Sequence, residues 1–294
     1  MRKIIPTLAA SLAAALALTA CGSSTPETTV PSGSPTAADT SAGTDDAPAG
    51  EVTVVKVGAS PVPHQLILEY IDENLAADAG IDLEITPFED YVLPNEALAD
   101  GSLDANYFQH LPYLEQQILE RGFEFEHGAG IHIEPLSLFS GQHASVADIP
   151  DGGVIAITND VSNQNRGLKL LEKEGLLTDV ADDTTALSLT PEQNPKGLVF
   201  EENQPEVIVQ LVDDPKVDAA VVNSNFILTA GLNTQDAIAV ESVEGNPYAN
   251  ILVWRTDNTN QGVAVLEELL HSPEVADFIR TQWPSGDVLP GDAA

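Results

Sequence analysis

Apolar and polar residues follow two alternating periods along most of the chain. Short runs rich in β-branched residues have the pattern of strands, and the segments between them have the three-to-four-residue apolar spacing of helices. The segments expected to be strands are residues 51–60, 80–91, 102–110, 130–140, 152–160, 197–202, 216–223 and 246–258. The segments expected to be helices are residues 61–76, 93–101, 112–122, 162–177, 205–214, 224–232, 261–272 and 273–283. From about residue 50 onward, the pattern therefore predicts strands that alternate with helices.

Strands and helices in this order are typical of a parallel α/β sheet. The pattern runs to residue 140, begins again at Gly152 and returns near residues 240–250. We therefore expect an α/β fold with two lobes. The first lobe is expected to comprise residues 51–140 plus about 246–294, and the second lobe residues 141–245.

The first residues carry an export signal. Residues 1–20 begin with Arg2 and Lys3 and continue as an Ala- and Leu-rich run, which is the pattern of a signal peptide. A membrane span would need roughly 20 uninterrupted apolar residues. The run ends in Leu-Thr-Ala-Cys at Cys21, which resembles a bacterial lipobox, in which the cysteine is lipidated and becomes the new N-terminus. We therefore expect Cys21 to carry a lipid anchor.

Residues 21–50 are dominated by Ser, Thr, Pro, Ala, Gly and Asp, with almost nothing to bury. Burial cannot offset the entropy of ordering such a segment, so we expect a disordered tether. Two α/β lobes on a lipid tether suggest a periplasmic-binding-protein-like fold, which closes around a ligand at a hinge. The ligand cleft would lie between the lobes, beyond the carboxyl ends of the strands.

The formal net charge of −35 excludes some classes of protein. The chain has only eleven Lys and Arg, and two of them lie in the signal peptide, so no basic patch can neutralise the phosphates of a nucleic acid. The acidity is the mark of a well-solvated surface. Because cations are scarce, an arginine inside a polar segment is a candidate anion site.

Aromatic residues mark the ends of two expected strands. Tyr91 ends the strand 80–91, and the stretch 104–110 reads DANYFQH. Strand alternation would place Asn106, Phe108 and His110 on one face of that stretch. With Tyr91, such a face could wall an apolar pocket with one polar edge, although core packing alone would also explain any single aromatic residue.

Arg166 is the candidate anion site. It follows the strand 152–160 and is expected in the first turn of a helix capped by Ser162, where the helix dipole and free N–H groups favour an anion. A guanidinium can bind a carboxylate through two parallel hydrogen bonds. Asn163 flanks it, and Asn223 and Asn250 lie at other strand ends, where they could complete a carboxylate site or serve only as cap and turn residues.

Neither a metal site nor an enzyme is expected. The histidines are scattered, and only His127 and His132 lie near each other on expected strands, so we expect no metal and no cofactor. Cys21 is the only cysteine, so neither a disulfide within the chain nor a cysteine nucleophile is possible. The absence of a G-x-S-x-G motif disfavours a secreted hydrolase. An adhesive surface lipoprotein remains an alternative.

Several long stretches resemble the methionine-binding lipoproteins that feed a methionine ABC importer. The resemblance runs from about Val52 to the C-terminal helices, and the stretches that carry it are residues 88–98, 104–114, 157–177, 221–232 and 246–253. It implies two groups of ligand-binding residues: Tyr91, Phe108 and His110 around the side chain, and Arg166, Asn223 and Asn250 at the carboxylate.

The resemblance implies an extracytoplasmic solute-binding lipoprotein that captures L-methionine and delivers it to the permease and ATPase of an importer. It would have no reaction of its own and would be held at the cell membrane by its lipid. Residues 161–166 read VSNQNR where this family commonly has Pro, Thr and Gly, and Phe226 stands where a Tyr is usual. D-methionine, a methionine-containing dipeptide or another small amino-acid ligand therefore remain alternatives.

Overall fold

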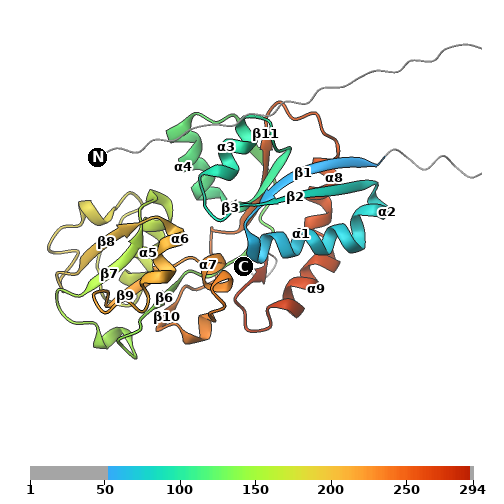
Figure 1. Ribbon diagram of the computed structural model, residues 1–294. Coiled ribbons are helices and arrows are strands. Elements are labelled where there is room, and N and C mark those ends of the chain that lie inside the picture. Colours follow the sequence, from blue (N-terminus) through green and yellow to red (C-terminus); the bar gives the residue numbers. More distant parts are fainter. Residues whose placement is uncertain (1–51, 292–294) are drawn as a thin grey trace, which may run out of the picture. The chain divides into compact units, whose positions relative to one another are not determined.

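Two β-sheets organise the part of the chain that the computed structural model describes, residues 52–291 (Figure 1). The expected signal peptide, the expected lipidation site Cys21 and the expected tether lie outside the described residues. The first sheet contains β1 (Thr53–Ala59), β2 (Ile81–Pro87), β3 (Ala105–His110), β4 (Phe125–His127), β5 (His132–Ile133), β11 (Asn250–Arg255) and β12 (Leu289–Pro290). The second sheet contains β6 (Ser137–Phe139), β7 (Val154–Thr158), β8 (Val199–Asn203), β9 (Ala219–Val222) and β10 (Ala239–Val240).

The helices lie close to where the apolar spacing predicts them. The α-helices are α1 (Leu66–Ile71), α2 (Ala77–Ala79), α3 (Leu93–Ala99), α4 (Leu111–Arg121), α5 (Val161–Lys173), α6 (Pro205–Ile208), α7 (Ser224–Thr229), α8 (Gly262–Leu270) and α9 (Pro273–Gln282). Segments of π-helix at Pro61–Gln65 and Asp72–Ala76 join α1 and α2 into one helical stretch, which continues to Ala79, beyond the expected end at residue 76. Short 3-10 turns lie at Val146–Asp148, Ala186–Ser188, Val209–Leu211 and Thr234–Asp236.

The expectation of parallel sheets is correct for only part of each sheet. β2, β1 and β3 are parallel neighbours, as are β8, β7 and β9. In contrast, β11 is antiparallel to β3, and β6 is antiparallel to β9. These antiparallel strands belong to the segments that pass between the sheets. A strand that enters a sheet from another lobe can have either direction, and its apolar pattern does not reveal which.

The chain passes between the two sheets at two places near each other in space. The first crossing lies between β5 and β6, and the second lies between β10 and β11. We expected the first crossing near residue 140, but β6 already belongs to the second sheet and begins at Ser137. Glu241 N donates to Leu136 O at 2.8 Å, so the two crossing segments are hydrogen-bonded to each other.

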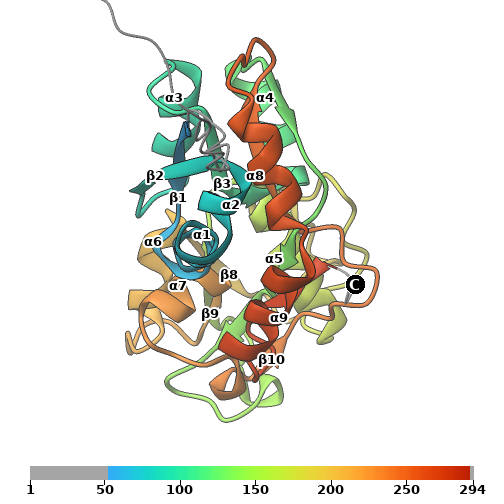
Figure 2. The same ribbon diagram turned by 90° about the vertical axis from the view of Figure 1, so that its right-hand side faces the viewer.

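Each sheet has its own buried apolar core. In the first, Val55 and Val57 of β1 pack with Ile67 of α1, Leu266 of α8 and Ile279 of α9, and Figure 2 shows α8 and α9 in the same part of the molecule as α1. In the second, Ile155 and Ile157 of β7 pack with Leu168 and Leu171 of α5. A third buried cluster, rich in aromatic residues, connects side chains from both sheets. Rigid cores therefore flank a region of contact between the sheets.

Helix α5 begins differently from our expectation. Its N-cap is Asp160, whose carboxylate accepts from Asn163 N at 2.8 Å, whereas Ser162 lies inside the helix. Asp160 extends from the end of β7, and Thr158 Oγ1 donates to its other oxygen at 2.6 Å, which fixes the carboxylate at the helix N-terminus. Arg166 consequently lies in the second turn of α5 and not in the first.

Helix α5 also lies unusually close to the second sheet at Gly167. A Cβ atom at this position would be 2.9 Å from Val221 Cγ1 of β9 and 3.1 Å from Ile157 Cδ1 of β7. Both contacts are shorter than ordinary van der Waals contacts, so this residue has no room for a side chain. The close approach sets the position of the neighbouring Arg166. Among the described residues, no helix is long and apolar enough to span a bilayer.

Candidate functional site

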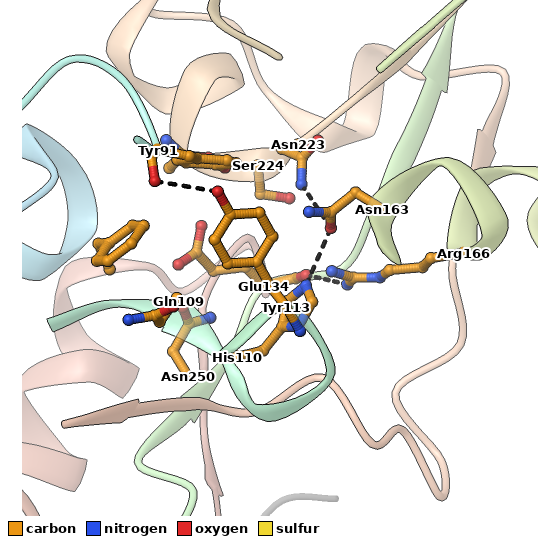
Figure 3. A pocket seen from close by; sticks show the side chains of 12 residues that line it. Tyr91, Gln109, His110, Tyr113, Glu134, Asn163, Arg166, Asn223, Ser224 and Asn250 are labelled. Carbon is orange, nitrogen blue, oxygen red and sulfur yellow. Dashed lines mark hydrogen bonds between the residues drawn. The ribbon is translucent and has the colours of Figure 1, made fainter. Parts of the chain in front are cut away.

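A pocket lies between the two sheets, and its lining comes from both of them (Figure 3). All seven residues that the sequence singled out for ligand binding line this pocket: Tyr91, Phe108, His110, Asn163, Arg166, Asn223 and Asn250. Five further lining residues were not expected: Gln109, Tyr113, Glu134, Ser224 and Asn225. Asn223 follows β9 and His110 ends β3, so carboxyl ends of strands from both sheets contribute to the lining, as expected for ligand sites in such folds.

One wall of the pocket is aromatic. The Tyr91 ring lies 5.9 Å from the Phe108 ring, 5.7 Å from the Tyr113 ring and 5.2 Å from the Phe226 ring, measured between centroids. Tyr91 donates its hydroxyl to Asn225 Oδ1 at 2.6 Å, and Tyr113 donates to the Tyr91 carbonyl at 3.0 Å. The hydroxyl groups are therefore satisfied by the protein, and the rings present an ordered apolar surface.

The arrangement of side chains on β3 differs from simple alternation. The register with β11 shifts, because Gln109 pairs with Ile251 and Tyr107 with Leu252, which leaves Phe108 as the extra residue of a β-bulge. Gln109 donates to Asn106 Oδ1 at 3.0 Å, so these two side chains lie together although alternation would separate them. The expectation that Asn106 shares its face with Phe108 and His110 is therefore wrong, since the bulge redirects the end of the strand.

Arg166 is buried and held by both crossing segments. Its Nε lies 3.0 Å from Glu241 Oε1, and its Nη2 lies 2.5 Å from Glu241 Oε2 and 2.7 Å from the Glu134 carbonyl oxygen. The Tyr248 ring packs against the guanidinium, with Cζ 4.3 Å from the ring centroid. Nη1 has no hydrogen bond to any residue in the described part of the chain, and the side chain lines the pocket. Nη1 can therefore donate to an anion in the pocket.

The helix N-terminus does not supply the anion site that we expected beside Arg166. The Asp160 carboxylate already accepts from the first turn of α5, and it also accepts from Asn163 Nδ2 at 3.0 Å. A second anion at this position would be repelled by Asp160. The positive charge available to a ligand is therefore that of the Arg166 side chain.

His110 is neutral and has one defined tautomer. Tyr113 N donates to His110 Nδ1 at 3.1 Å, so the ring proton lies on Nε2, which donates to Asn163 Oδ1 at 2.9 Å. Burial and then the charge of Arg166 lower the pKa of His110 to about 3. Asn223 Nδ2 also donates to Asn163 Oδ1, at 3.1 Å. Asn163 thus joins the first sheet to the second and orients both neighbours.

Glu134 contributes a carboxyl group to the same pocket as Arg166. It lies on the first crossing segment, is 7% exposed and lines the pocket. Burial raises the pKa of its carboxyl group, whereas its interactions with His64 and with the charged Arg166 oppose this shift. His132 Nε2 lies 2.8 Å from Oε1 and His64 Nε2 lies 3.3 Å from the same oxygen. Sequence analysis missed Glu134 because it is one of 46 acidic residues and belongs to no motif.

His64, His132 and Glu134 form the one cluster of metal-ligand type found in the described part of the chain, with ligand atoms within 4.8 Å of one another. The expected strand pair does not form it, because His127 is exposed and contacts Gly128 O instead. His132 Nε2 and His64 Nε2 lie 2.8 Å and 3.3 Å from the same oxygen, Glu134 Oε1, which are distances for direct hydrogen bonds to that oxygen. The geometry fits a hydrogen-bonded cluster better than a metal centre.

The pocket is tightly closed. Its cavity volume is about 20 Å³, which is room for about one water molecule. The contacts Tyr91–Asn225 and His110–Asn163 join residues of the first lobe to residues of the second across this space. An amino acid can enter only if the two lobes move apart or the lining side chains rearrange.

Comparisons with known proteins place these features in context. The profile of the family described as NlpA lipoprotein matches residues 55–291. Over 241 residues, the chain is 38% identical to the methionine-binding lipoprotein MetQ of Bacillus subtilis (strain 168). This match covers 80% of this chain and 87% of the relative. The chain is 34% identical over 238 residues to the D-methionine-binding lipoprotein MetQ of Escherichia coli (strain K12), with 80% and 87% coverage.

A solved structure of a nutrient-binding protein from Burkholderia cenocepacia bound to methionine has the same fold, with a TM-score of 0.75 and 35% identity. That likeness covers 81% of this chain and 99% of the solved chain. The two-lobed architecture predicted from the alternation of strands and helices is therefore confirmed at the level of the fold.

Proposed function

The chain belongs to the NlpA lipoprotein family, and we propose that it is a solute-binding lipoprotein that captures L-methionine and delivers it to an ABC importer. The observation that carries this proposal is the pairing of one cationic and one anionic side chain beside an aromatic wall. Arg166 Nη1 has no hydrogen-bond partner among residues 52–291, Glu134 lines the same pocket, and Tyr91 and Phe108 form part of the wall.

A zwitterionic amino acid complements this arrangement. Its carboxylate would accept from Arg166 Nη1, with the side chains of Asn223 and Asn250 nearby as neutral partners. Its ammonium group would donate to Glu134, and its side chain would lie against Phe108 and Tyr91. A thioether suits such a wall, because sulfur–aromatic contacts contribute about 0.3–1.5 kcal/mol.

Ligand entry would require movement at the two crossing segments. Arg166 binds both segments, through the Glu134 carbonyl and the Glu241 carboxylate, so the carboxylate-binding side chain is attached to the expected hinge. A bound ligand would bridge the lobes and favour the closed state by its differential affinity. This is the behaviour that delivery of a captured solute to an importer needs.

We propose no reaction for this site. The pocket serine, Ser224, donates its hydroxyl proton to the Pro135 carbonyl, and the pocket histidine, His110, donates to an amide oxygen. Neither group is arranged as a nucleophile with its base. Turnover of ester or peptide substrates by the purified protein would contradict this part of the proposal.

A thermal-shift screen tests the ligand class. Among the twenty common amino acids, L-methionine should stabilise the protein most, leucine less, and glutamine and lysine least. A polar side chain against the aromatic wall would leave hydrogen bonds unmade, at about 1–3 kcal/mol each. D-methionine and methionine-containing dipeptides belong in the same screen, because they are the alternative ligands. Strongest stabilisation by a charged amino acid would contradict the methionine assignment.

Membrane attachment is proposed to depend on Cys21 alone. Cys21→Ser should move the protein from the membrane fraction to the soluble fraction, because stable anchoring needs the two or more acyl chains of a lipoprotein. Its L-methionine affinity should equal that of the wild-type protein, since the folded residues are unchanged. Cell fractionation followed by titration calorimetry measures both properties. Quantitative retention of the variant in membranes would contradict a lipid anchor.

A further inference from the structure

A fully buried chain of polar groups extends behind Glu134, away from the pocket. Tyr107 of β3 contacts His132 Nδ1 of β5 through its hydroxyl, and His132 Nε2 lies 2.8 Å from Glu134 Oε1. Tyr107 and His132 are both 0% exposed. Burying three polar side chains in an apolar core is costly unless each is paired, and here each of the three is paired within the chain.

The protonation states of Tyr107 and His132 set the direction of the protons in this chain. Burial raises the pKa of Tyr107 well above its usual value, so its hydroxyl keeps its proton and can donate to His132 Nδ1. Burial lowers the pKa of His132 to about 3, so the ring is neutral and carries one proton. That proton then lies on Nε2 and is donated to the carboxylate.

A second histidine acts on the same carboxylate and on Asn250. His64 Nε2 lies 3.1 Å from Asn250 Oδ1 and 3.3 Å from Glu134 Oε1, and both of these atoms are acceptors. The ring proton therefore lies on Nε2, while Nδ1 is buried without a partner in the described part of the chain. With Oδ1 bound to His64, the Nδ2 group of Asn250 is left for a ligand in the pocket.

We propose that Tyr107 and His132 form a positioning relay that holds the Glu134 carboxylate as the subsite for the ligand's α-ammonium group. This inference rests on the proposed function. The relay holds Oε1 of the carboxylate, and the Asn225 backbone also hydrogen-bonds to this carboxylate, so the acceptor capacity that remains is left to the pocket. Tyr107 and His132 do not line the pocket, and Glu134 is the lining residue to which this chain is hydrogen-bonded.

The test compares two ligands that differ only in the ammonium group: L-methionine and 4-(methylthio)butanoate. Tyr107→Phe removes one hydroxyl and keeps the ring. It should reduce the affinity for L-methionine about tenfold and change the affinity for the des-amino analogue about twofold at most. The reason is that the lost hydrogen bond supports only the carboxylate that binds the ammonium group, which the analogue lacks. Titration calorimetry on the full-length protein gives both dissociation constants and therefore their ratio.

Two further variants separate the relay from general destabilisation. Tyr70→Phe removes a hydroxyl from the same lobe, where Tyr70 stacks on Phe278, and should leave the ratio unchanged. Glu134→Gln should abolish most of the preference for L-methionine, and adding Tyr107→Phe to it should not lower the ratio further. The relay would be overturned if Tyr107→Phe left the ratio of the two dissociation constants unchanged, whether it weakened the binding of both ligands equally or of neither.

A measurement on the wild-type protein keeps the inference testable if Tyr107→Phe does not fold. Nitrogen-15 NMR at neutral pH should show His132 as the neutral tautomer with its proton on Nε2. The opposite tautomer, an imidazolium, or a tightly bound divalent metal at one per chain would overturn the relay. A wild-type protein that binds the des-amino analogue as tightly as L-methionine would overturn it too. A wild-type protein that binds neither ligand would instead reject the proposed function itself.

Discussion

Arg166→Ala should reduce the affinity for L-methionine by about 2–5 kcal/mol, which is roughly 30-fold to several thousand-fold. The ligand carboxylate would enter a buried pocket without its charge partner. Arg166→Lys should restore only part of the affinity, because an ammonium group cannot bind Glu241, the Glu134 carbonyl and the ligand with the geometry of a guanidinium. Titration calorimetry with L-methionine measures both effects.

The same substitution also leaves the partly buried Glu241 without its arginine partner, so a loss of folding must be separated from a loss of binding. Breaking one side of a fully buried ion pair costs about 3–5 kcal/mol of stability, and because Glu241 keeps some contact with solvent, we expect a smaller loss here. The double variant Arg166→Met/Glu241→Gln removes both charges and should recover much of the stability but none of the affinity. Affinity that returned in the double variant would show that Arg166 acts only through the fold.

Phe108→Ala should change the ligand specificity of the pocket. Removing the ring should weaken the binding free energy of L-methionine by about 1–3 kcal/mol through lost apolar contact, and the residues that bind the carboxylate should be unaffected. Because leucine and methionine would lose different amounts of contact, the preference for methionine over leucine should narrow. Thermal-shift and calorimetric measurements on the two ligands test both statements.

Phe125→Ala is the matched control for Phe108→Ala. Phe125 is a buried phenylalanine in β4 of the same sheet and does not line the pocket. Both variants should lose stability, by about 3–5 kcal/mol for a fully buried phenylalanine. Only Phe108→Ala should change the ratio of methionine to leucine affinity. An equal change in both variants would indicate an effect of stability and not of contact.

The sequence predicts most of the fold because its signals are local. The alternation of strand and helix patterns gives the longer elements, including the helical stretch after β1 and the strand that contains Asn250, but not the short strands β4, β10 and β12. Pairing is not a local property, and the antiparallel partners of β11 and β6 could not be read from their residues. The bulge at Phe108 is likewise invisible in the sequence, because it arises from the register of two distant strands.

Sequence alone identifies some residues of the candidate site and not others. Arg166 was found because cations are rare in this chain, although the reason first given, a free helix N-terminus, is wrong, since Asp160 occupies it. Glu134 could not be singled out in this way, because acidic residues are common in this chain. The sequence pairs His132 with His127 and not with His64, because His64 and His132 are far apart in sequence and meet only when β5 and the helical stretch after β1 pack around Tyr107.

The binding mode of L-methionine can be seen in a crystal structure of the protein with this ligand. We expect one methionine between the two lobes, with its carboxylate on Arg166 Nη1 and Asn250, its ammonium group on Glu134 and its thioether against Phe108. A methionine bound outside this pocket, or bound with its carboxylate toward Glu134, would show that the proposed site is wrong.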